Sequence, residues 1–209
     1  MSTVIVLAKE CVPGRVKTRL TPPFTSEEAA ALAAASLADT LEAASRVHAD
    51  RHLLWFDGVA PRGTGFDVVQ QPAGGLDERI GAAFDHVRDR AVLVGMDTPQ
   101  LDPAVLQAVL DDRTADAWFG PAADGGWWAL GLDPMPNRGD LVRGTPMSTD
   151  MTGAAQALRL IAAGLRVRRL PELTDFDHVA EAHVAAAQAP DSRFAALLAR
   201  LTAHVPADA

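Results

Sequence analysis

Three cations follow the first apolar run of the chain. Residues 8–20 read AKECVPGRVKTRL and place Arg15, Lys17 and Arg19 at every second position behind a Pro-Gly turn. Alternate positions of an extended loop face one side, so these cations could hold a chain of phosphates. They could equally form a solvated surface turn. The loop matches neither the Walker P-loop nor the G-x-G-x-x-G dinucleotide fingerprint.

A single carboxylate follows another apolar run. Asp97 lies in VLVGMDTPQL, just past the point where a buried strand would end. Mg²⁺ prefers one or two carboxylates together with phosphate oxygens, so Asp97 is a candidate metal ligand. Alternatively, Asp97 caps the next helix. Asp102, directly before Pro103, is the better cap, which leaves Asp97 free for another role.

A glycine-rich turn carries a third carboxylate. Asp124, Gly125 and Gly126 lie in GPAADGGWWALGL, and glycines there would let the backbone approach a ligand closely. Asp-Gly is also a strong hairpin signal, and the spacing alone favours that plain hairpin. Of the two tryptophans that follow, one could line a pocket, whereas we expect the other in the core.

Two carboxylates lie close together near the C-terminus. Asp175 and Asp177, in LTDFDHVAEA, would face the same side of an extended segment. One of them could complete a metal site begun by Asp97. Alternatively, Asp177 caps a helix, with Glu181 in that helix's second turn. The six histidines show no metal-ligand spacing.

All these motifs fall where predicted strands end. The expected strands are 4–8, 51–56, 66–71, 91–95, 116–120, 127–132 and 165–170. The expected helices are 25–47, 76–90, one from 103, 151–163 and the Ala-rich C-terminal sequence. Thr25 and Glu28 have the spacing of a capping box. This alternation predicts βαβ units and a mainly parallel sheet, which binds ligands at the carboxyl ends of its strands. Residues 133–147 are irregular and could form a lid.

Composition limits the functions that remain. The 209 residues predict one domain, 1–209, with residues 190–209 as a C-terminal helix and tail. A net charge of -8 argues against a nucleic-acid-coating surface but allows a local anion site. Cys11 is the only cysteine, so no intrachain disulfide can form. We expect no signal peptide, no membrane span, a cytoplasmic location, and a monomer or homodimer.

Five segments, taken in order, resemble a known bacterial family. The chain is similar to the glycosyltransferase-like proteins often called transferase 1, found beside radical-SAM and selenium-domain proteins. The segments are VIVLAKECVPGRVKTRL, GMDTPQL, GPAADGGWWALGL, TPMST and GLRVRRLPELTDFDH. The resemblance covers about residues 4 to 185. The chain is also similar to 2-phospho-lactate guanylyltransferases, which share the K-[ST]-R-L loop and the D-G-G turn.

The resemblance implies a fold and a set of site residues. The fold is α/β, a single-domain glycosyltransferase-A (nucleotide-diphospho-sugar transferase) fold with a Rossmann-like, mostly parallel sheet. Lys17 and Arg19 would bind nucleotide phosphates, and Asp97 with Asp177 would hold Mg²⁺ or Mn²⁺. Asp124 would face the nucleotide sugar or the acceptor. The remaining nucleotide- or substrate-binding candidates are Ala8, Lys9, Gly14, Arg15, Gly75, Arg79, Gly125 and Gly126.

The chain departs from the family pattern at two candidate sites. A G-D-L-G-x-R motif, expected against the base or sugar, is replaced by Gly-Gly-Leu-Asp-Glu-Arg at residues 74–79. The ending is D-F-D-H, not D-V-D-T, which puts His178 beside a proposed metal ligand. A histidine there could alter metal preference or take part in proton transfer.

We therefore expect a Mg²⁺-dependent, nucleotide-binding transferase in which Lys17, Arg19 and Asp97 are catalytic. It would be glycosyltransferase-like, with a nucleotide or nucleotide-sugar donor and a small-molecule acceptor. The alternative is a nucleotidyltransferase that releases pyrophosphate. The residues themselves favour this alternative, because Asp97 lies in D-T-P, not D-x-D, and the basic loop suits a triphosphate. A third hypothesis is a non-catalytic nucleotide-binding protein.

Overall fold

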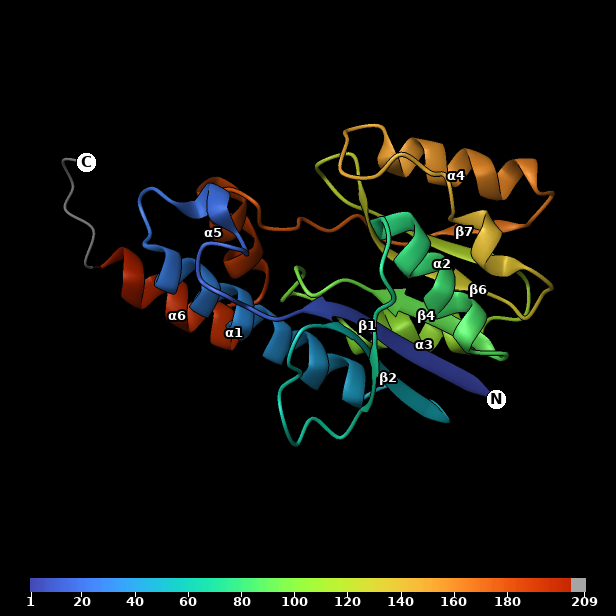
Figure 1. Cartoon of the computed structure of the whole chain (residues 1–209), viewed down its shortest axis with the longest axis horizontal. Helices are drawn as coiled ribbons and strands as arrows, with labels where there is room; N and C mark the ends of the chain where they lie inside the picture. The colour runs from blue at the N-terminus through green and yellow to red at the C-terminus, as the bar shows by residue number, and fades with distance from the viewer. Residues whose placement is uncertain (204–209) are drawn as a thin grey trace.

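Two wholly apolar runs form the central strands of a seven-stranded sheet. The computed structural model describes residues 1–203 (Figure 1). Strand β1 (Ser2–Lys9) pairs in parallel with β2 (Arg51–Asp57) and with β4 (Arg90–Val94). All five residues of β4 are buried, as expected for a strand covered on both faces.

The sheet is mixed but mostly parallel. The strand order is β3-β2-β1-β4-β6-β5-β7, with β3 at Asp67–Gln70, β5 at Ala117–Pro121, β6 at Trp127–Leu132 and β7 at Val167–Arg169. Only β6 runs antiparallel to its neighbours within the described residues. The predicted α/β class is thus confirmed. Whether the chain is a single domain stays a prediction.

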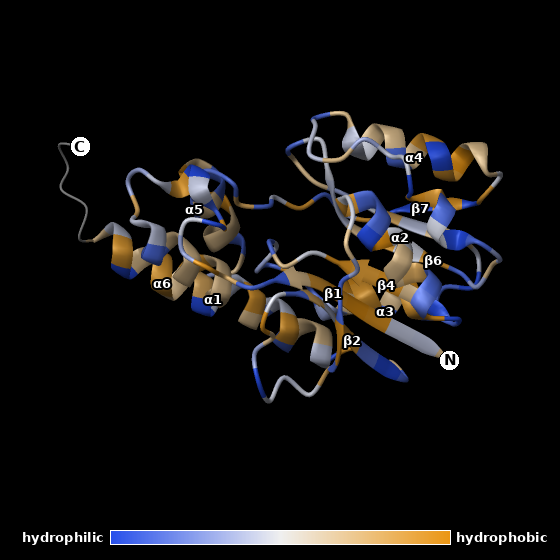
Figure 2. Cartoon of the chain, viewed as in Figure 1, coloured by the Kyte–Doolittle hydropathy of each residue, from blue (hydrophilic) through white to orange (hydrophobic). Residues whose placement is uncertain are grey.

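Helices cover both faces of this sheet. They are α1 (Ser26–Ser45), α2 (Leu76–His86), α3 (Pro103–Asp111), α4 (Thr152–Ala162), α5 (Val179–Gln188) and α6 (Arg193–Thr202). Along β1, Val4 and Val6 pack toward α1 and α3, whereas Ile5 packs toward α2 and α4. This alternation gives the apolar centre visible around β1 and β4 in Figure 2.

A third apolar cluster joins the two ends of the chain. Helices α5 and α6 pack beside α1 at one end of the molecule (Figure 1). Phe176 and Phe194 have ring centroids 4.3 Å apart, and both are fully buried. The first segment after β1, including Leu20 of the short 3-10 turn η1 (Thr18–Leu20), packs into the same cluster. The loop with the cations and the C-terminal helices therefore share a core.

Helix capping agrees with the sequence. Thr25 Oγ1 accepts from Glu28 N at 3.2 Å while Glu28 Oε2 accepts from Thr25 N at 2.8 Å. Asp102 Oδ1 accepts from Ala104 N at 2.8 Å and so caps α3. The predicted start of α1 and the assignment of the α3 cap to Asp102 are both confirmed.

The predicted end of α2 is wrong, and the segment proposed as a lid is held in place at its middle. Helix α2 ends at His86 because Arg90 begins β4, with its Nε 2.5 Å from Asp133 Oδ1. Within residues 133–147, Arg138 is 3% exposed in the 3-10 turn η2 (Arg138–Leu141). Its guanidinium donates to the carbonyls of Phe84, Val87 and Asp89. The middle of this segment is therefore anchored to the end of α2.

The predicted last strand is shorter than expected, and residues 204–209 of the predicted C-terminal helix and tail lie outside the described residues. Strand β7 has three residues, and residues 171–178 run extended before α5 begins at Val179. In the described part of the chain, no helix combines the length and apolar character that crossing a bilayer requires.

Candidate functional site

A cleft of about 670 Å³ opens at the carboxyl ends of the parallel strands. Strands β1, β3 and β4 end at it, and the β5–β6 turn and the extended segment before α5 close its other side. Among the residues proposed from sequence, those lining it are Ala8, Lys9, Arg19, Arg79, Asp97, Asp124, Gly126, Asp175, Asp177 and His178. The expectation that strand-end motifs meet at one edge of the sheet agrees with this placement.

A buried lysine joins two of the carboxylates. Lys17 Nζ lies 3.1 Å from Asp97 Oδ1 and 2.9 Å from Asp177 Oδ1, and its side chain is 4% exposed. The ammonium also lies 4.2 Å from the ring centroid of Phe176. Burial alone would lower the pKa of Lys17, but the two carboxylates raise it above its ordinary value. Lys17 is therefore a cation that lies behind the cleft wall.

Arg19 completes this ion-pair cluster from the solvent side. Its Nη1 lies 2.7 Å from Asp177 Oδ2, and its side chain is 65% exposed. Burial would raise the pKa of Asp177, but Lys17 and Arg19 hold it below its ordinary value. The alternative in which Asp177 caps α5 is wrong, because His178 is the N-cap and Glu181 Oε2 accepts from its backbone N–H.

The loop backbone explains why only two of the three cations reach this cluster. Gly14 (φ 75°) allows the chain to turn, and Lys17 itself is left-handed (φ 49°) as the turn η1 begins. A left-handed conformation costs a lysine about 1 kcal/mol, which the ion pairs can offset. It also breaks the expected alternation, so Arg15 is exposed and outside the cleft. The expectation that all three cations face one side is thus wrong.

One carboxylate oxygen of Asp97 contacts only a cation, the ammonium of Lys17. This oxygen, Oδ1, is shielded from solvent and accepts no hydrogen bond, and its close contact with Lys17 is an ion pair only. Two carboxylates converging on one cation fit a hard divalent ion. Within residues 1–203, no three His, Cys, Asp or Glu side chains are grouped to hold a metal. Further ligands would then be phosphate oxygens and water.

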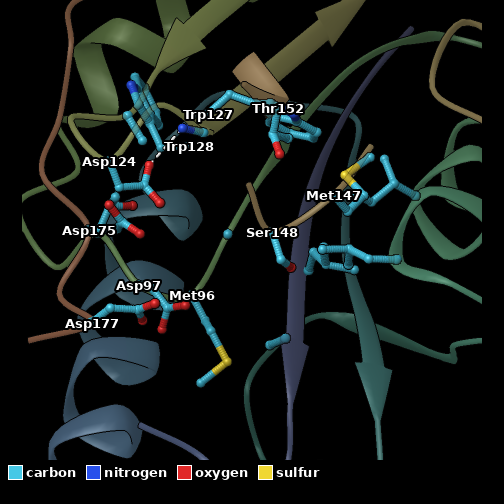
Figure 3. A pocket seen from close by; sticks show the side chains of 18 of the residues that line it. Met96, Asp97, Asp124, Trp127, Trp128, Met147, Ser148, Thr152, Asp175 and Asp177 are labelled. Carbon is cyan, nitrogen blue, oxygen red and sulfur yellow. Dashed lines mark hydrogen bonds between the residues drawn. The ribbon is translucent and has the colours of Figure 1, made fainter. Parts of the chain in front are cut away.

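A second carboxylate pair lies beside the first in Figure 3. Backbone pairing brings residues 121–123 against Leu173, through Leu173 N to Pro121 O at 3.2 Å and Ala123 N to Leu173 O at 3.0 Å. Asp124 and Asp175 consequently face each other in Figure 3. Burial, followed by the charge of Asp124, raises the pKa of Asp175 to about 6. The sequence offered Asp175 and Asp177 as alternative partners of Asp97 in a metal site. No sequence pattern predicted that Asp175 would instead lie beside Asp124.

The glycines after Asp124 serve the chain's own packing. The segment is a hairpin turn, with Gly125 N donating to Ala122 O at 3.2 Å and Gly126 N donating to Asp124 Oδ1 at 2.7 Å. A Cβ on Gly125 (φ 87°) would lie 2.1 Å from the carbonyl oxygen of Asp150. The hairpin interpretation is therefore right. Gly125 does not line the cleft, whereas Gly126 does.

The opposite half of the cleft is built around an amide that the sequence did not single out. Gln71 Nε2 donates to Ala8 O and to Trp55 O, both at 2.8 Å, and Gln71 Oε1 accepts from Arg79 Nη1 at 3.1 Å. Gly75 is the N-cap of α2 and lies outside the cleft lining. A lone glutamine at a strand end has no motif, so only the fold reveals it.

Comparison with known proteins agrees with this fold. A crystal structure of a "putative nucleotide-diphospho-sugar transferase" from Desulfovibrio desulfuricans superposes with a TM-score of 0.85 at 27% identity, covering 97% of this chain and 95% of that chain. This likeness confirms the glycosyltransferase-A fold.

More distant structures share the fold alone. Rv0371c from Mycobacterium tuberculosis, in complex with manganese, has a TM-score of 0.52 at 23% identity and covers 88% of this chain and 97% of that chain. CMP:2-keto-3-deoxy-manno-octonic acid synthetase in complex with CTP has a TM-score of 0.54 at 15% identity, covering 91% and 99%.

Among curated proteins, none matches the chain. The family model of uncharacterized proteins conserved in bacteria (DUF2064) matches residues 29–149, which is more than half of the sequence. Its match takes in the strand end at Asp97 and the hairpin turn at Asp124. The chain therefore belongs to the DUF2064 family of uncharacterized bacterial proteins, with the fold of the nucleotide-diphospho-sugar transferases.

Proposed function

We propose that the protein is a divalent-metal-dependent transferase that takes a group from a nucleotide-sugar donor to a small acceptor. One observation carries the proposal: Lys17, Arg19, Asp97 and Asp177 converge at the edge of a cleft large enough for a nucleotide. Cations and carboxylates in contact at a strand-end cleft suit a ligand that brings both phosphates and a metal.

In this proposal, Arg19 and Lys17 bind the phosphates of the donor. Arg19 lines the cleft with a largely exposed guanidinium, which can form two parallel hydrogen bonds to phosphate oxygens. Lys17 lies directly behind it and adds positive charge where negative charge develops during transfer. Lys9 and Arg79 also line this half of the cleft.

Asp97 and Asp177 would hold the divalent cation, Mg²⁺ or Mn²⁺. When bound, such a cation stabilises the negative charge of a departing phosphate. The manganese complex of a protein with the same fold is consistent with this assignment. Catalysis by the chain's own residues would then consist of positioning the donor and stabilising charge.

Nucleotidyl transfer is the second candidate, and a specific feature favours it. Asp97 is followed by Thr98-Pro99, so the metal site would combine carboxylates from two strand ends in place of a D-x-D pair. Glycosyl transfer ranks first because the Desulfovibrio protein matches nearly the full length of the chain. A cytoplasmic location, and a monomer or homodimer, remain part of the proposal.

The leaving group distinguishes the two chemistries. The protein is first screened by thermal shift against nucleoside triphosphates and nucleotide sugars, with Mg²⁺ and with a chelator, since any ligand of the native state raises the melting temperature. The nucleotide that binds is then incubated with acceptor mixtures. Release of a nucleoside diphosphate supports glycosyl transfer, and release of pyrophosphate supports nucleotidyl transfer.

Two outcomes contradict the proposal. If no nucleotide raises the melting temperature in the presence of metal, the protein is not a nucleotide-dependent transferase. Binding that is independent of metal and gives no turnover with any donor supports the third hypothesis, a non-catalytic nucleotide-binding protein.

A further inference from the structure

The two halves of the cleft carry opposite charge. The lining residues from β1, η1 and α2 include Lys9, Arg19 and Arg79. The lining residues between 122 and 152 include Asp124 and Asp150 and no cation, and Asp175 faces the same half. Asp97 and Asp177 lie at the boundary. A phosphate-bearing ligand is attracted to the first half and repelled by the second.

The carboxylates of the second half are fixed by the backbone. The pairing of residues 121–123 with Leu173 sets the separation of the two chain segments that carry Asp124 and Asp175. Asp124 Oδ1 also accepts from Gly126 N at 2.7 Å. Both segments are tied to the sheet. The distance between the backbones that carry the two carboxylates therefore stays the same when a ligand binds.

Two residues that line the cleft carry polar groups without a hydrogen-bond partner, which points to a ligand. Thr98 is 1% exposed and lines the cleft, yet its Oγ1 has no hydrogen-bond partner. The indole Nε1 of Trp127, at the start of β6, likewise has none. A buried hydroxyl or N–H without a partner is destabilising, so a polar ligand that reaches these groups would be stabilised. The aromatic rings of Trp127 and Trp128 supply an apolar wall.

We propose that this half of the cleft binds an acceptor that is neutral or cationic, bears hydroxyl or amino groups, and carries no phosphate. This inference rests on the proposed function and names the acceptor class for it. Hydroxyl and ammonium groups donate hydrogen bonds to Asp124 and Asp175, whereas a phosphorylated acceptor meets like charge in a half of the cleft that no cation lines. The resemblance to 2-phospho-lactate guanylyltransferases would thus extend to the phosphate-binding loop and not to an anionic acceptor.

A fluorescence experiment measures the charge of this half directly. Of the four tryptophans, Trp55, Trp118 and Trp128 are at most 4% exposed, so collisional quenchers report on the half-buried Trp127. Quenching by caesium and by iodide is compared at constant ionic strength. The caesium-to-iodide ratio is expected to be about threefold higher in the wild type than in D124N/D175N, from screened interactions with two charges.

The test variant and the control variant each remove two negative charges, and both are expected to keep the fold. Asparagine at position 124 retains the oxygen that accepts from Gly126 N. The control, E27Q/D191N, removes two exposed carboxylates outside the cleft lining and should keep the wild-type ratio. Far-UV circular dichroism checks the folding of both variants.

A pair of sugars tests the ligand class with the same protein. Glucosamine and glucosamine 6-phosphate are titrated with Trp127 fluorescence as the signal, and glucosamine should bind at least about tenfold more tightly. D124N/D175N should lose this preference. The proposal is overturned if iodide quenches the wild type as well as caesium does, if the phosphorylated sugar binds equally or better, or if neither sugar binds. Failure of nucleotides to bind contradicts the proposed function. The quenching ratio and the sugar titration can still be interpreted in that case, because neither uses a nucleotide.

Discussion

The ammonium group of Lys17 lies 3.1 Å from Asp97 Oδ1, and a third residue, Asp177, places its Oδ1 2.9 Å from the same nitrogen. A monovalent cation from the chain thus lies between the two carboxylates proposed as metal ligands. Lys17 and a divalent ion compete for the same oxygens. Binding of a metal with its nucleotide would release Lys17 toward the phosphates.

Replacing Lys17 by Met should therefore affect two ligands in opposite directions. In the absence of nucleotide, the affinity for Mn²⁺ is expected to rise about tenfold, since a competing cation in a partly solvated site is worth on the order of 1 kcal/mol. The affinity for pyrophosphate should fall. Electron paramagnetic resonance titration of Mn²⁺ and calorimetry with pyrophosphate measure the two effects.

The control for this variant is Arg15→Met, which removes a cation from the same loop but outside the cleft. Both affinities should stay near the wild-type values. If Lys17→Met weakens Mn²⁺ binding, the competition between ammonium and metal is disproved.

The roles of Asp97 and Asp102 can be distinguished by two measurements on their alanine variants. One is the metal-dependent thermal shift with nucleotide, and the other is the free energy of unfolding. Asp97→Ala should abolish the metal-dependent part of the nucleotide thermal shift without unfolding the protein, because it caps no helix. Asp102→Ala removes the α3 cap and should cost about 1 kcal/mol of unfolding free energy, with the metal-dependent shift intact. Thermal and urea unfolding of both variants test this. An Asp97→Ala protein that fails to fold would contradict the assignment.

The contribution of Asp175 to stability should increase as the pH falls. A salt-bridged carboxylate does the opposite, because its pKa is lowered and its contribution is lost at low pH. The pKa of Asp175 is raised from 3.8 to about 6, so between those values the folded state binds more protons than the unfolded state. This residue's contribution to stability therefore improves as the pH falls through 6 toward 4. Asp175→Asn should remove a gain on the order of 1 kcal/mol, after allowance for solvent screening.

The measurement is the difference in unfolding free energy between wild type and Asp175→Asn at pH 7.5 and pH 4.5. Asp191→Asn, an exposed carboxylate, serves as the comparison and should leave the pH dependence unchanged. An Asp175→Asn variant with the wild-type pH dependence would show that Asp175 titrates normally.

The single cysteine should be a poor nucleophile. Burial, followed by the charge of Asp97, raises the pKa of the Cys11 thiol to about 11. At pH 8, alkylation by iodoacetamide is expected to be about 100-fold slower in the folded than in the guanidinium-unfolded protein, because the thiolate is the reactive form. Mass spectrometry at timed intervals gives the rates, and similar rates in both states would refute this expectation.

Two glycines with similar backbone angles should tolerate alanine very differently. Gly125 (φ 87°) has the Asp150 carbonyl in the path of a Cβ, whereas Gly14 (φ 75°) has no atom within 4 Å of one. Gly125→Ala should cost more than ~2 kcal/mol, and Gly14→Ala about 1 kcal/mol from its left-handed backbone alone. Urea denaturation compares them, and equal losses would mean that the hairpin turn shifts freely.

Much of the fold could be predicted because its signals are local. Wholly apolar runs mark β1 and β4, and the cap at Asp102 depends on residues within a few positions of it. The strand-end rule then brings Asp97, Asp124 and Asp177 to one edge of the sheet. These expectations need only periodicity and the geometry of parallel strands.

The features that could not be predicted depend on distant contacts. The left-handed backbone of Lys17 is compensated by carboxylates 80 and 160 positions away, and no local pattern announces it. Gln71 acquires its role from the carbonyls of Ala8 and Trp55. Arg138 turns a segment that resembles a lid into an anchored one. In each case, the tertiary partner decides what the residue does.

The aromatic contact between Phe176 and Phe194 has a consequence for biosynthesis. Asp177 directly follows Phe176, whose position depends on α6, whereas Lys17 and α1 belong to the first quarter of the chain. The ion-pair cluster can therefore assemble only after the ribosome has released the C-terminal helices from its exit tunnel. The nascent chain can form much of its sheet earlier, but the proposed metal site stays incomplete until α6 has emerged.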